Sequence, residues 1–381
     1  MFVLTDEQRM LVDNVGRIAR THFLPKAQKW DDECVPPVEN LTVLAEQGFL
    51  GICVPTEYGG LGASNVDLVL MVEKISESCP NTAILSGSFD GATPRSLVAL
   101  GTEDQKRRYL PKFVTGELLP VWGMSEPNAG SDVGALSTRA VKKGDRYILN
   151  GSKIWCSGAQ LAGLALVFAR MSDAPGLKGV GALLVETASP GFSVGNHLDL
   201  MGLRGTGMAE LFFDDVDVPE ENLLVRPGQM KDLLSVFNGD RVTTNPPICL
   251  GAAQAAFDAA VRYMSERTQF GRKLSEFQGL QWRVADMAIE LAAARNLLYQ
   301  TAAAFDRGEG TSLASSIVKT YLNEVSVRVT NTAVQMMGTM GLTREAVPQR
   351  MYRDVRGMSF GYGTTEIQRN MIAKEIFGAL Q

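Results

Sequence analysis

A loop at residues 122–134 carries the groups best suited to hold a ligand. It follows a strand-like run at 118–122 and contains three glycines and one proline. Glycine and proline both disfavour a helix interior. The bare backbone N–H groups and small hydroxyls of such a loop can approach a ligand closely. The same composition fits an ordinary polar turn, so the rest of the chain must decide between the two interpretations.

The histidines and cysteines argue against two familiar kinds of site. The chain has only two histidines, His22 and His197, which disfavours a histidine-based triad or a multi-histidine metal centre. Its five cysteines are scattered and never form a Cys-X-X-Cys pair. That pattern is typical of reduced thiols in a cytoplasm and predicts no zinc site. Any chemistry must therefore come from carboxylates, hydroxyls or a bound cofactor, and we expect no metal.

The bulk composition is that of a globular protein with two or three domains. Of its 381 residues, 45% are hydrophobic and 21% are charged. The formal net charge of −5 argues against nucleic-acid binding, which normally requires a basic stripe. No apolar run approaches the ~20 residues that span a bilayer. Because residues 1–7 also lack the features of a signal peptide, we expect a cytoplasmic protein with no membrane span.

The hydrophobic period changes twice along the chain and predicts three domains. Residues 1–120 show helical spacing, residues 121–227 contain short strands that end in turns, and residues 228–381 contain long helices rich in alanine, leucine and methionine. We therefore predict an α+β multidomain fold. It consists of an N-terminal helical domain, a central β-barrel-like domain and a C-terminal four-helix bundle.

Five segments fall into the order and spacing of one known family. They are Met124-Ser125-Glu126-Pro127 with Gly130-Ser131-Asp132, Asn150 to Trp155, Arg267 to Gly271, Gln335-Met336-Met337-Gly338 with Gly341, and Gly363 to Arg369. One such motif would be weak evidence, but five in register cover essentially the whole chain. The sequence resembles the acyl-CoA dehydrogenase family.

This resemblance implies an FAD between the β domain and the C-terminal bundle, with an acyl-CoA thioester against the flavin. Met124 and Ser125 would contact the flavin ring, Trp155 would cover its other face, and Ser157 would hydrogen-bond nearby. Hydroxyl and backbone donors beside a flavin stabilise the charge that arrives with a hydride. The substrate side would be formed by Ser131 on the CoA arm, together with Phe237, Arg241 and Tyr362.

The resemblance also implies that subunits share their cofactor sites. Arg267 and Phe270 resemble a pair that reaches the FAD of a neighbouring subunit, and Gln335 and Gly338 resemble a second such segment. Within the last motif, Thr364, Glu366 and Gln368 would lie on the diphosphate and adenosine side of the FAD. Contacts of this kind imply a homotetramer, or at least a dimer.

The sequence departs from the family pattern at the base. Many members place a glutamate just before the Gly-Thr of the last motif, where this chain has Tyr362. A phenol with an ordinary pKa near 10 is a poor base at neutral pH. Asp240, followed by Arg241, matches the position at which other members carry a Glu-Arg pair, although its side chain is one methylene shorter. Asp240 could instead be a helix N-cap paired with Arg241.

Asp90, in Ser88-Phe89-Asp90-Gly91, is the second candidate base, although an Asp-Gly pair is also a common turn signal. Two aspartates at one apolar acyl site would have separated pKa values and could divide the acid and base roles. With the usual glutamate absent, this combination resembles the dehydrogenases of alicyclic acyl-CoA esters. Those enzymes take a proton from a remote ring carbon in a 1,4-dehydrogenation.

The sequence therefore predicts an FAD-dependent acyl-CoA dehydrogenase that passes its electrons to an electron-transferring flavoprotein. Two alternatives remain open. The first is an enoyl-CoA reductase that runs the same chemistry in reverse. The second is a catalytically silent, flavin-binding subunit of a hetero-oligomer, since the usual glutamate is missing.

Overall fold

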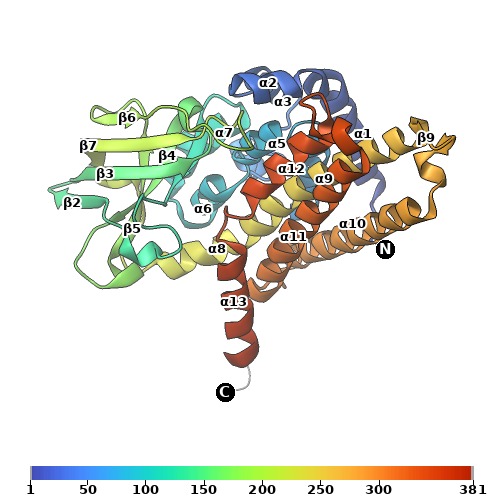
Figure 1. Ribbon diagram of the computed structural model, residues 1–381. Helices are drawn as coiled ribbons and strands as arrows, with labels where there is room; N and C mark the ends of the chain where they lie inside the picture. Colours follow the sequence, from blue (N-terminus) through green and yellow to red (C-terminus); the bar gives the residue numbers. More distant parts are fainter. Residues whose placement is uncertain (1, 379–381) are drawn as a thin grey trace.

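The structure is a computed structural model that describes residues 2–378. A β domain lies at one end of the molecule, and a bundle of long helices lies at the other (Figure 1). The N-terminal helices pack against both, and one hydrophobic core runs through these helices and the β domain. The expected α+β class, with its helical, β and helical parts in that order, is confirmed.

The N-terminal part consists of seven helices. They are α1 (Asp6–Ile18), α2 (Ala27–Glu33), α3 (Val38–Glu46), α4 (Asn65–Ser78), α5 (Pro80–Gly87), α6 (Ala92–Leu100) and α7 (Glu103–Val114). Three of them begin with a capping box, in which the cap hydroxyl and the third helical side chain satisfy each other's backbone N–H groups. The caps are Thr5, Ser64 and Thr102.

The β domain is one mixed sheet. Its strands are β1 (Leu119–Gly123), β2 (Arg139–Lys143), β3 (Arg146–Cys156), β4 (Ala162–Arg170), β5 (Val180–Glu186), β6 (Phe192–Val194), β7 (Ala209–Pro219) and β8 (Leu223–Val225). The order is β6-β7-β3-β2-β4-β5-β8, and β1 pairs in parallel with β4. Strands β4 and β5 are buried on both faces, which explains their continuous apolar runs.

The C-terminal part is helical apart from one small hairpin. Its elements are α8 (Met230–Thr243), α9 (Asn245–Glu266), β9 (Thr268–Gln269), β10 (Arg272–Lys273), α10 (Gln278–Asp306), α11 (Ser312–Met336), α12 (Val347–Met358) and α13 (Thr365–Gly378). Helices α9 to α12 pack together as the expected bundle. Within residues 2–378, no helix combines the length and the apolar character that crossing a membrane requires.

Helix α4 joins the two hydrophobic cores. Leu68, Met71 and Ile75 pack into the core shared with the β domain, whereas Val69 and Leu70 pack into the core of the bundle. A helix that is apolar on nearly every side must be covered on every side. Helix α4 therefore fixes how the C-terminal helices meet the rest of the molecule.

Two prolines separate α8 from α9. Pro246 and Pro247 occupy the first turn of α9, where a proline has no hydrogen bond to lose. The residue before a proline is disfavoured in the helical conformation, so the chain changes direction after Thr243. The last turn of α8 carries Asp240 and Arg241, and α8 packs against α6 and α11.

Candidate active site

Strand β3 supports the loop that follows β1. The buried Lys153 ammonium donates to the carbonyl of Met124 at 3.1 Å and to Oε1 of Glu126 at 2.7 Å. The backbone N–H of Ile154 donates to the carbonyl of Ser125 at 2.9 Å. Two successive carbonyls of the loop are therefore held by one strand, which fixes the positions of Met124 and Ser125.

Glu126 ties the far end of the same loop. Its carboxylate accepts from the N–H and the hydroxyl of Ser137, both at 2.6 Å, and from the N–H of Thr138 at 3.0 Å. Burial alone would raise the pKa of Glu126, but Lys153 and these hydrogen bonds outweigh it and lower the pKa to about 2. The loop thus encloses the ion pair of Glu126 and Lys153, which an ordinary polar turn does not need.

Trp155 projects from the β domain into solvent. The pairing of β3 with β7 shifts register between Lys153 and Cys156, and Trp155 has a φ of 63°. A bulge of this kind re-aims a side chain, and 55% of the indole is exposed. Trp155 is therefore no core aromatic, and its free face suits a planar ligand. Ser157 is half-buried two residues further on, and Ser131 is exposed in the loop.

Three aromatic rings stack between the β domain and α8. Phe237 lies between Trp122 and Tyr362, with ring centroids 5.2 Å from each and interplanar angles of 19° and 13°. The Arg241 guanidinium lies over the Phe237 ring at 5.3 Å and donates through Nε to the Tyr362 carbonyl at 3.3 Å. Phe237, Arg241 and Tyr362, the predicted substrate-side residues, thus form one cluster.

Asp240 is completely buried beside this cluster. Its Oδ1 accepts from the Thr244 hydroxyl at 2.9 Å, and its Oδ2 accepts no hydrogen bond from any described residue. The Tyr362 phenol lies next to the carboxylate and acts to lower its pKa. Burial raises the pKa of Asp240 to about 6, against the opposing effects of Arg95, the two hydroxyls and Arg241.

Two alternatives for Asp240 are wrong in the structure. Asp240 lies near the end of α8, so it is not an N-cap. Arg241 also forms no ion pair with it among the described contacts. The Arg241 guanidinium instead donates through Nη1 to Asn238 at 2.9 Å and to Ser315 at 3.3 Å. An unpaired buried carboxylate costs free energy of folding, which is common at functional sites.

Asp90 lies in the turn between α5 and α6, so the backbone forms the turn that the Asp-Gly pair predicts. Its side chain is 1% exposed and accepts from the N–H of Cys53 at 2.7 Å, while Oδ2 has no partner among the described residues. Burial raises the pKa of Asp90 to about 6, opposed by that N–H and by Arg95. The expected separation between the pKa values of Asp90 and Asp240 is therefore wrong, because burial raises both alike.

The residues expected to serve a neighbouring subunit lie far from the β domain. Arg267 is exposed where α9 ends, and Phe270 is 93% exposed at the tip of the β9–β10 hairpin. This hairpin and the β domain are at opposite ends of the molecule (Figure 1). Gln335 and Gly338 are exposed where α11 ends. None of these four residues belongs to the cluster around Asp240.

The last motif forms the start of α13. The Thr364 hydroxyl caps the helix by accepting from the N–H of Ile367 at 3.3 Å, and Glu366 is exposed in the first turn. Gln368 is buried and donates to the carbonyl of Tyr362 at 3.0 Å, while its Oε1 has no partner among the described residues. The motif thus holds Tyr362 in place and leaves an acceptor free beside it.

Four functional residues were not predicted as such from the sequence. Lys153 and Glu126 both lie within recognised motifs, and a lysine in an apolar strand is a signal for a buried partner. Arg95 lies near both aspartates and lowers the pKa of each. Its only sequence signal is a single charge in the otherwise uncharged segment 92–100. Thr244, which orients Asp240, follows it by one helical turn.

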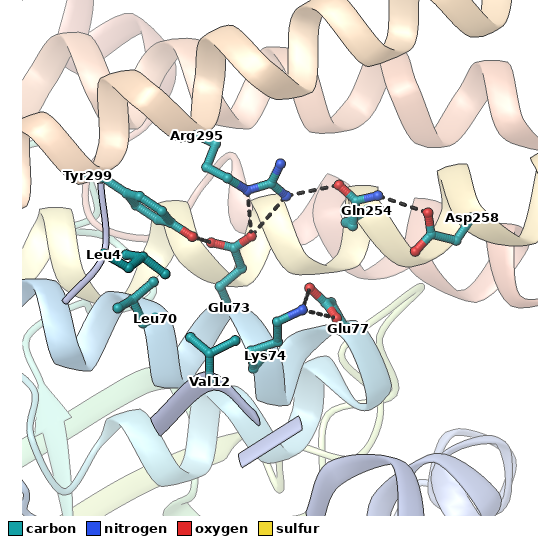
Figure 2. Close-up of a pocket in the computed structure, with 10 residues that line it drawn as sticks. All are labelled: Leu4, Val12, Leu70, Glu73, Lys74, Glu77, Gln254, Asp258, Arg295 and Tyr299. Carbon is teal, nitrogen blue, oxygen red and sulfur yellow. Dashed lines mark hydrogen bonds and ion pairs between the residues drawn. The ribbon is translucent and has the colours of Figure 1, made fainter. Parts of the chain in front are cut away.

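A cavity of about 320 Å³ also lies between α4, α9 and α10. Figure 2 shows that its charged groups contact one another. Buried Glu73 accepts from Arg295 at 2.9 Å and from the Tyr299 hydroxyl at 2.6 Å. Arg295 continues the chain to Gln254 at 2.9 Å. Because these groups satisfy each other, we attribute the network to packing of α4 against the bundle.

A buttressed loop with hydroxyls, an exposed indole and a buried carboxylate are groups that a flavin-dependent oxidoreductase would use. The residues fit a flavin, since the loop offers backbone groups and hydroxyls, Trp155 offers a planar aromatic surface, and the free Oε1 of Gln368 can accept a further hydrogen bond.

The comparisons with known proteins identify the family. Residues 5–117, 122–216 and 231–377 match the N-terminal, middle and C-terminal domains of acyl-CoA dehydrogenases. The chain belongs to the acyl-CoA dehydrogenase family. It is therefore an FAD-dependent oxidoreductase that acts on CH–CH bonds of acyl-CoA thioesters.

Three relatives illustrate the extent of the similarity. Acryloyl-CoA reductase (NADH) of Anaerotignum propionicum is 37% identical over 98% of this chain and 95% of that protein. Butyryl-CoA dehydrogenase of Megasphaera elsdenii superimposes with a TM-score of 0.96 at 31% identity, over 99% of this chain and 100% of that one. A chain from a structural study of the electron transferring flavoprotein of Acidaminococcus fermentans has a TM-score of 0.95 at 35% identity, with 99% of both chains covered.

Proposed function

We propose that the protein dehydrogenates a small acyl-CoA and that Asp240 is the base. The observation that carries this proposal is the buried, unpaired Asp240 carboxylate beside Tyr362. A general base works best with a pKa near the working pH. With a pKa of about 6, Asp240 is mostly ionised at neutral pH and is more basic than an ordinary aspartate.

In the proposed reaction, Asp240 takes a proton from Cα of the thioester while the β-hydrogen leaves as hydride, and the C=C bond forms. Bound FAD supplies the hydride acceptor. Thr244 orients the carboxylate through its hydrogen bond to Oδ1. The stack of Trp122, Phe237 and Tyr362 excludes water from the side at which the proton is taken. Met124, Ser125, Trp155 and Ser157 would hold the flavin.

The exposed loop would supply contacts to the part of the substrate away from the reacting carbons. Ser131 is exposed in the loop after β1, and on α8 the Arg241 guanidinium lies over the Phe237 ring. We assign the CoA arm to these residues. Tyr362 would contact the acyl group and fill the space that a glutamate takes in other members.

The proposal extends to a homotetramer and to an electron-transferring flavoprotein as the electron acceptor. Exposed Phe270 on a hairpin remote from the chain's own β domain supports a shared cofactor site, as do exposed Arg267, Gln335 and Gly338. Thr364, Glu366 and Gln368 would contribute to the diphosphate and adenosine side. The similarity to the chain from the Acidaminococcus study supports the flavoprotein partner.

Asp90 supports a second candidate function, the 1,4-dehydrogenation of an alicyclic acyl-CoA. A second buried carboxylate with a free oxygen is the group that would accept a proton from a more remote ring carbon. The reductase direction is a third candidate, supported by 37% identity to an acryloyl-CoA reductase. In that direction, a protonated Asp240 would return the proton to Cα.

A substrate panel tests these candidates. The FAD-loaded protein is mixed without oxygen with straight-chain, branched and alicyclic acyl-CoAs, and bleaching of the flavin is followed. We expect bleaching with small straight or branched thioesters. Bleaching only with alicyclic thioesters favours the second candidate. Bound FAD that no thioester bleaches would contradict the proposal and support a silent subunit.

A further inference from the structure

A cavity of about 330 Å³ lies behind α8, and we name it the rear cavity. Its lining includes Arg95 and Val98 from α6, Ser235, Val236 and Gly239 from α8, and Asp90 from the turn before α6. The volume is far above the ~10–15 Å³ that one water molecule needs. Ser235 is exposed, so the rim of the cavity reaches the surface.

The rear cavity and the aromatic stack lie on opposite faces of α8. Ser235, Val236 and Gly239 share one face at helical spacing, whereas Phe237 and Arg241 share the other. Asp240 lies between the two faces, because Val236 precedes it by four positions and Phe237 by three. The Asp240 side chain therefore lies at the boundary between the face of the rear cavity and the face of the aromatic stack.

Two glycines, Gly91 and Gly239, lie beside Asp240 and the rear cavity. A Cβ on Gly91 would lie 3.3 Å from Oδ1 of Asp240, and a Cβ on Gly239 would lie 3.8 Å from Nη1 of Arg95. Gly91 follows Asp90 directly and Gly239 precedes Asp240 directly. A side chain at Gly91 would therefore contact the Asp240 carboxylate, and one at Gly239 would contact Arg95 and Phe305.

Asp90 forms the inner wall of the rear cavity. Its Oδ1 is held by the N–H of Cys53 at 2.7 Å, and its Oδ2 has no partner among the described residues. A buried acceptor beside a cavity with room for water normally binds a water molecule. Arg95 supplies the nearby positive charge that lowers the pKa of both aspartates.

We propose that the rear cavity is the exit route for the proton that Asp240 removes from the substrate, with Asp90 as the relay. This inference rests on the proposed role of Asp240. First, the Cα–H bond of the thioester breaks and an O–H bond forms on Asp240. That O–H bond then breaks as the proton passes to Oδ2 of Asp90 and on to cavity water. Asp240 returns to a carboxylate, and no electrons move in the transfer.

The front of Asp240 does not offer this route. Phe237 and Tyr362 close that side by stacking, and the acyl thioester would occupy what remains. A proton held on a buried carboxylate without another exit would return to Cα. The rear cavity lets the base reset while the product is still bound.

Exchange of the substrate α-proton with solvent isolates this transfer. The probe is 3-thiabutyryl-CoA, whose sulfur replaces the β-carbon, so that it can lose an α-proton but has no β-hydrogen to give as hydride. Exchange of its α-protons for deuterium is followed by NMR in D₂O with the FAD-loaded enzyme. Deuterium enters only after Asp240 has traded its proton with solvent.

Val98→Trp and Val236→Trp fill the rear cavity, and Asp90→Asn removes the relay. Ala99→Trp is the matched control, because Ala99 is the exposed neighbour of Val98 on α6. We expect at least tenfold slower exchange in the three test variants, an unchanged affinity for the probe, and wild-type exchange in the control. Wild-type exchange rates in Asp90→Asn and in either cavity-filling variant would overturn the proposal.

The variant Asp240→Asn distinguishes an error in the proposed exit route from an error in the assignment of the base. Loss of exchange in this variant supports Asp240 as the base whatever the cavity variants show. Exchange at the wild-type rate would overturn the assignment of the base, and the exit route with it.

Discussion

The Tyr362 ring lies parallel to the Phe237 ring, with 5.2 Å between the centroids and 13° between the planes. Tyr362 stands where many family members carry a glutamate, and it has a φ of 61°. Hydrogen bonds from Arg241 and Gln368 to its carbonyl hold this unusual backbone conformation. The phenol is thereby kept next to Asp240, so the carboxylate at this site comes from α8 instead of the last motif.

Flavin reduction should rise with pH through about 6. Asp240 must be ionised to accept a proton, and burial raises its pKa to about 6. The rate should therefore fall below that pH and level off above it. Arg95→Gln removes a charge that lowers this pKa, so the midpoint should move to higher pH. The pH dependence of anaerobic flavin bleaching measures both midpoints. A midpoint in Arg95→Gln at or below that of the wild type would contradict the electrostatic role.

Asp354→Asn should stabilise the protein at alkaline pH without changing its activity. Asp354 accepts from the N–H of Leu203 at 2.6 Å, yet burial raises its pKa from 3.8 to about 6. The folded state therefore binds this proton more tightly than the unfolded state does. The associated stability is present below pH ~4 and is lost as the pH rises through about 6.

At pH 8 the substitution should raise the free energy of unfolding by about 3 kcal/mol, from the difference between 3.8 and about 6 at ~1.4 kcal/mol per pKa unit. At pH 4 it should make no difference. Denaturant unfolding at the two pH values provides the test, and an equal gain at both would rule out the titration of Asp354 as its cause.

Lys153→Met should destabilise the protein and weaken FAD binding together. The substitution leaves Glu126 buried without its counter-charge, which typically costs about 3–5 kcal/mol. It also frees the carbonyl of Met124, which Lys153 holds at 3.1 Å. Adding Glu126→Gln should restore most of the stability but not the affinity for FAD. Thermal unfolding and FAD titration separate the two effects, and full FAD affinity in Lys153→Met would show that the pair does not position the loop.

Phe270→Ala should leave the isolated fold intact and disturb the assembly. The side chain is 93% exposed and packs only edge-on against Phe277, with centroids 6.4 Å apart. If Phe270 reaches a partner's FAD, its removal should reduce both the mass in solution and the FAD content. Analytical ultracentrifugation and the flavin-to-protein ratio report these quantities. A wild-type mass and a wild-type FAD content in Phe270→Ala would contradict a cofactor site shared between subunits.

Local patterns predicted much of the fold, but the site depends on contacts between distant segments. The strands and the long helices follow from spacing and neighbouring residues. The pairing of Lys153 with Glu126 and the approach of Arg95 to Asp240 depend on segments that are separated in the sequence. Strain at Trp155 has no local signal either, because it arises where β3 and β7 change register.

The same distinction between local signals and long-range packing applies to the candidate site residues. The family motifs indicated the loop, the exposed indole and the candidate bases, and these roles stay predictions. The common burial of Asp90 and Asp240 could not be read from residue types, because it depends on how α6 and α8 pack. For that reason the expected separation of their pKa values failed. The domain boundaries at residues 120 and 227 likewise remain predictions.

The most direct test of the account compares Asp240→Asn and Asp90→Asn with the wild type in anaerobic flavin bleaching, using the best thioester from the substrate panel. Both variants should retain FAD and bind the thioester, because asparagine has nearly the same shape as aspartate. We predict that Asp240→Asn loses at least a thousandfold in the bleaching rate, while Asp90→Asn reduces the flavin in a single turnover at close to the wild-type rate. Bleaching by Asp240→Asn at the wild-type rate would contradict the assignment of Asp240 as the base.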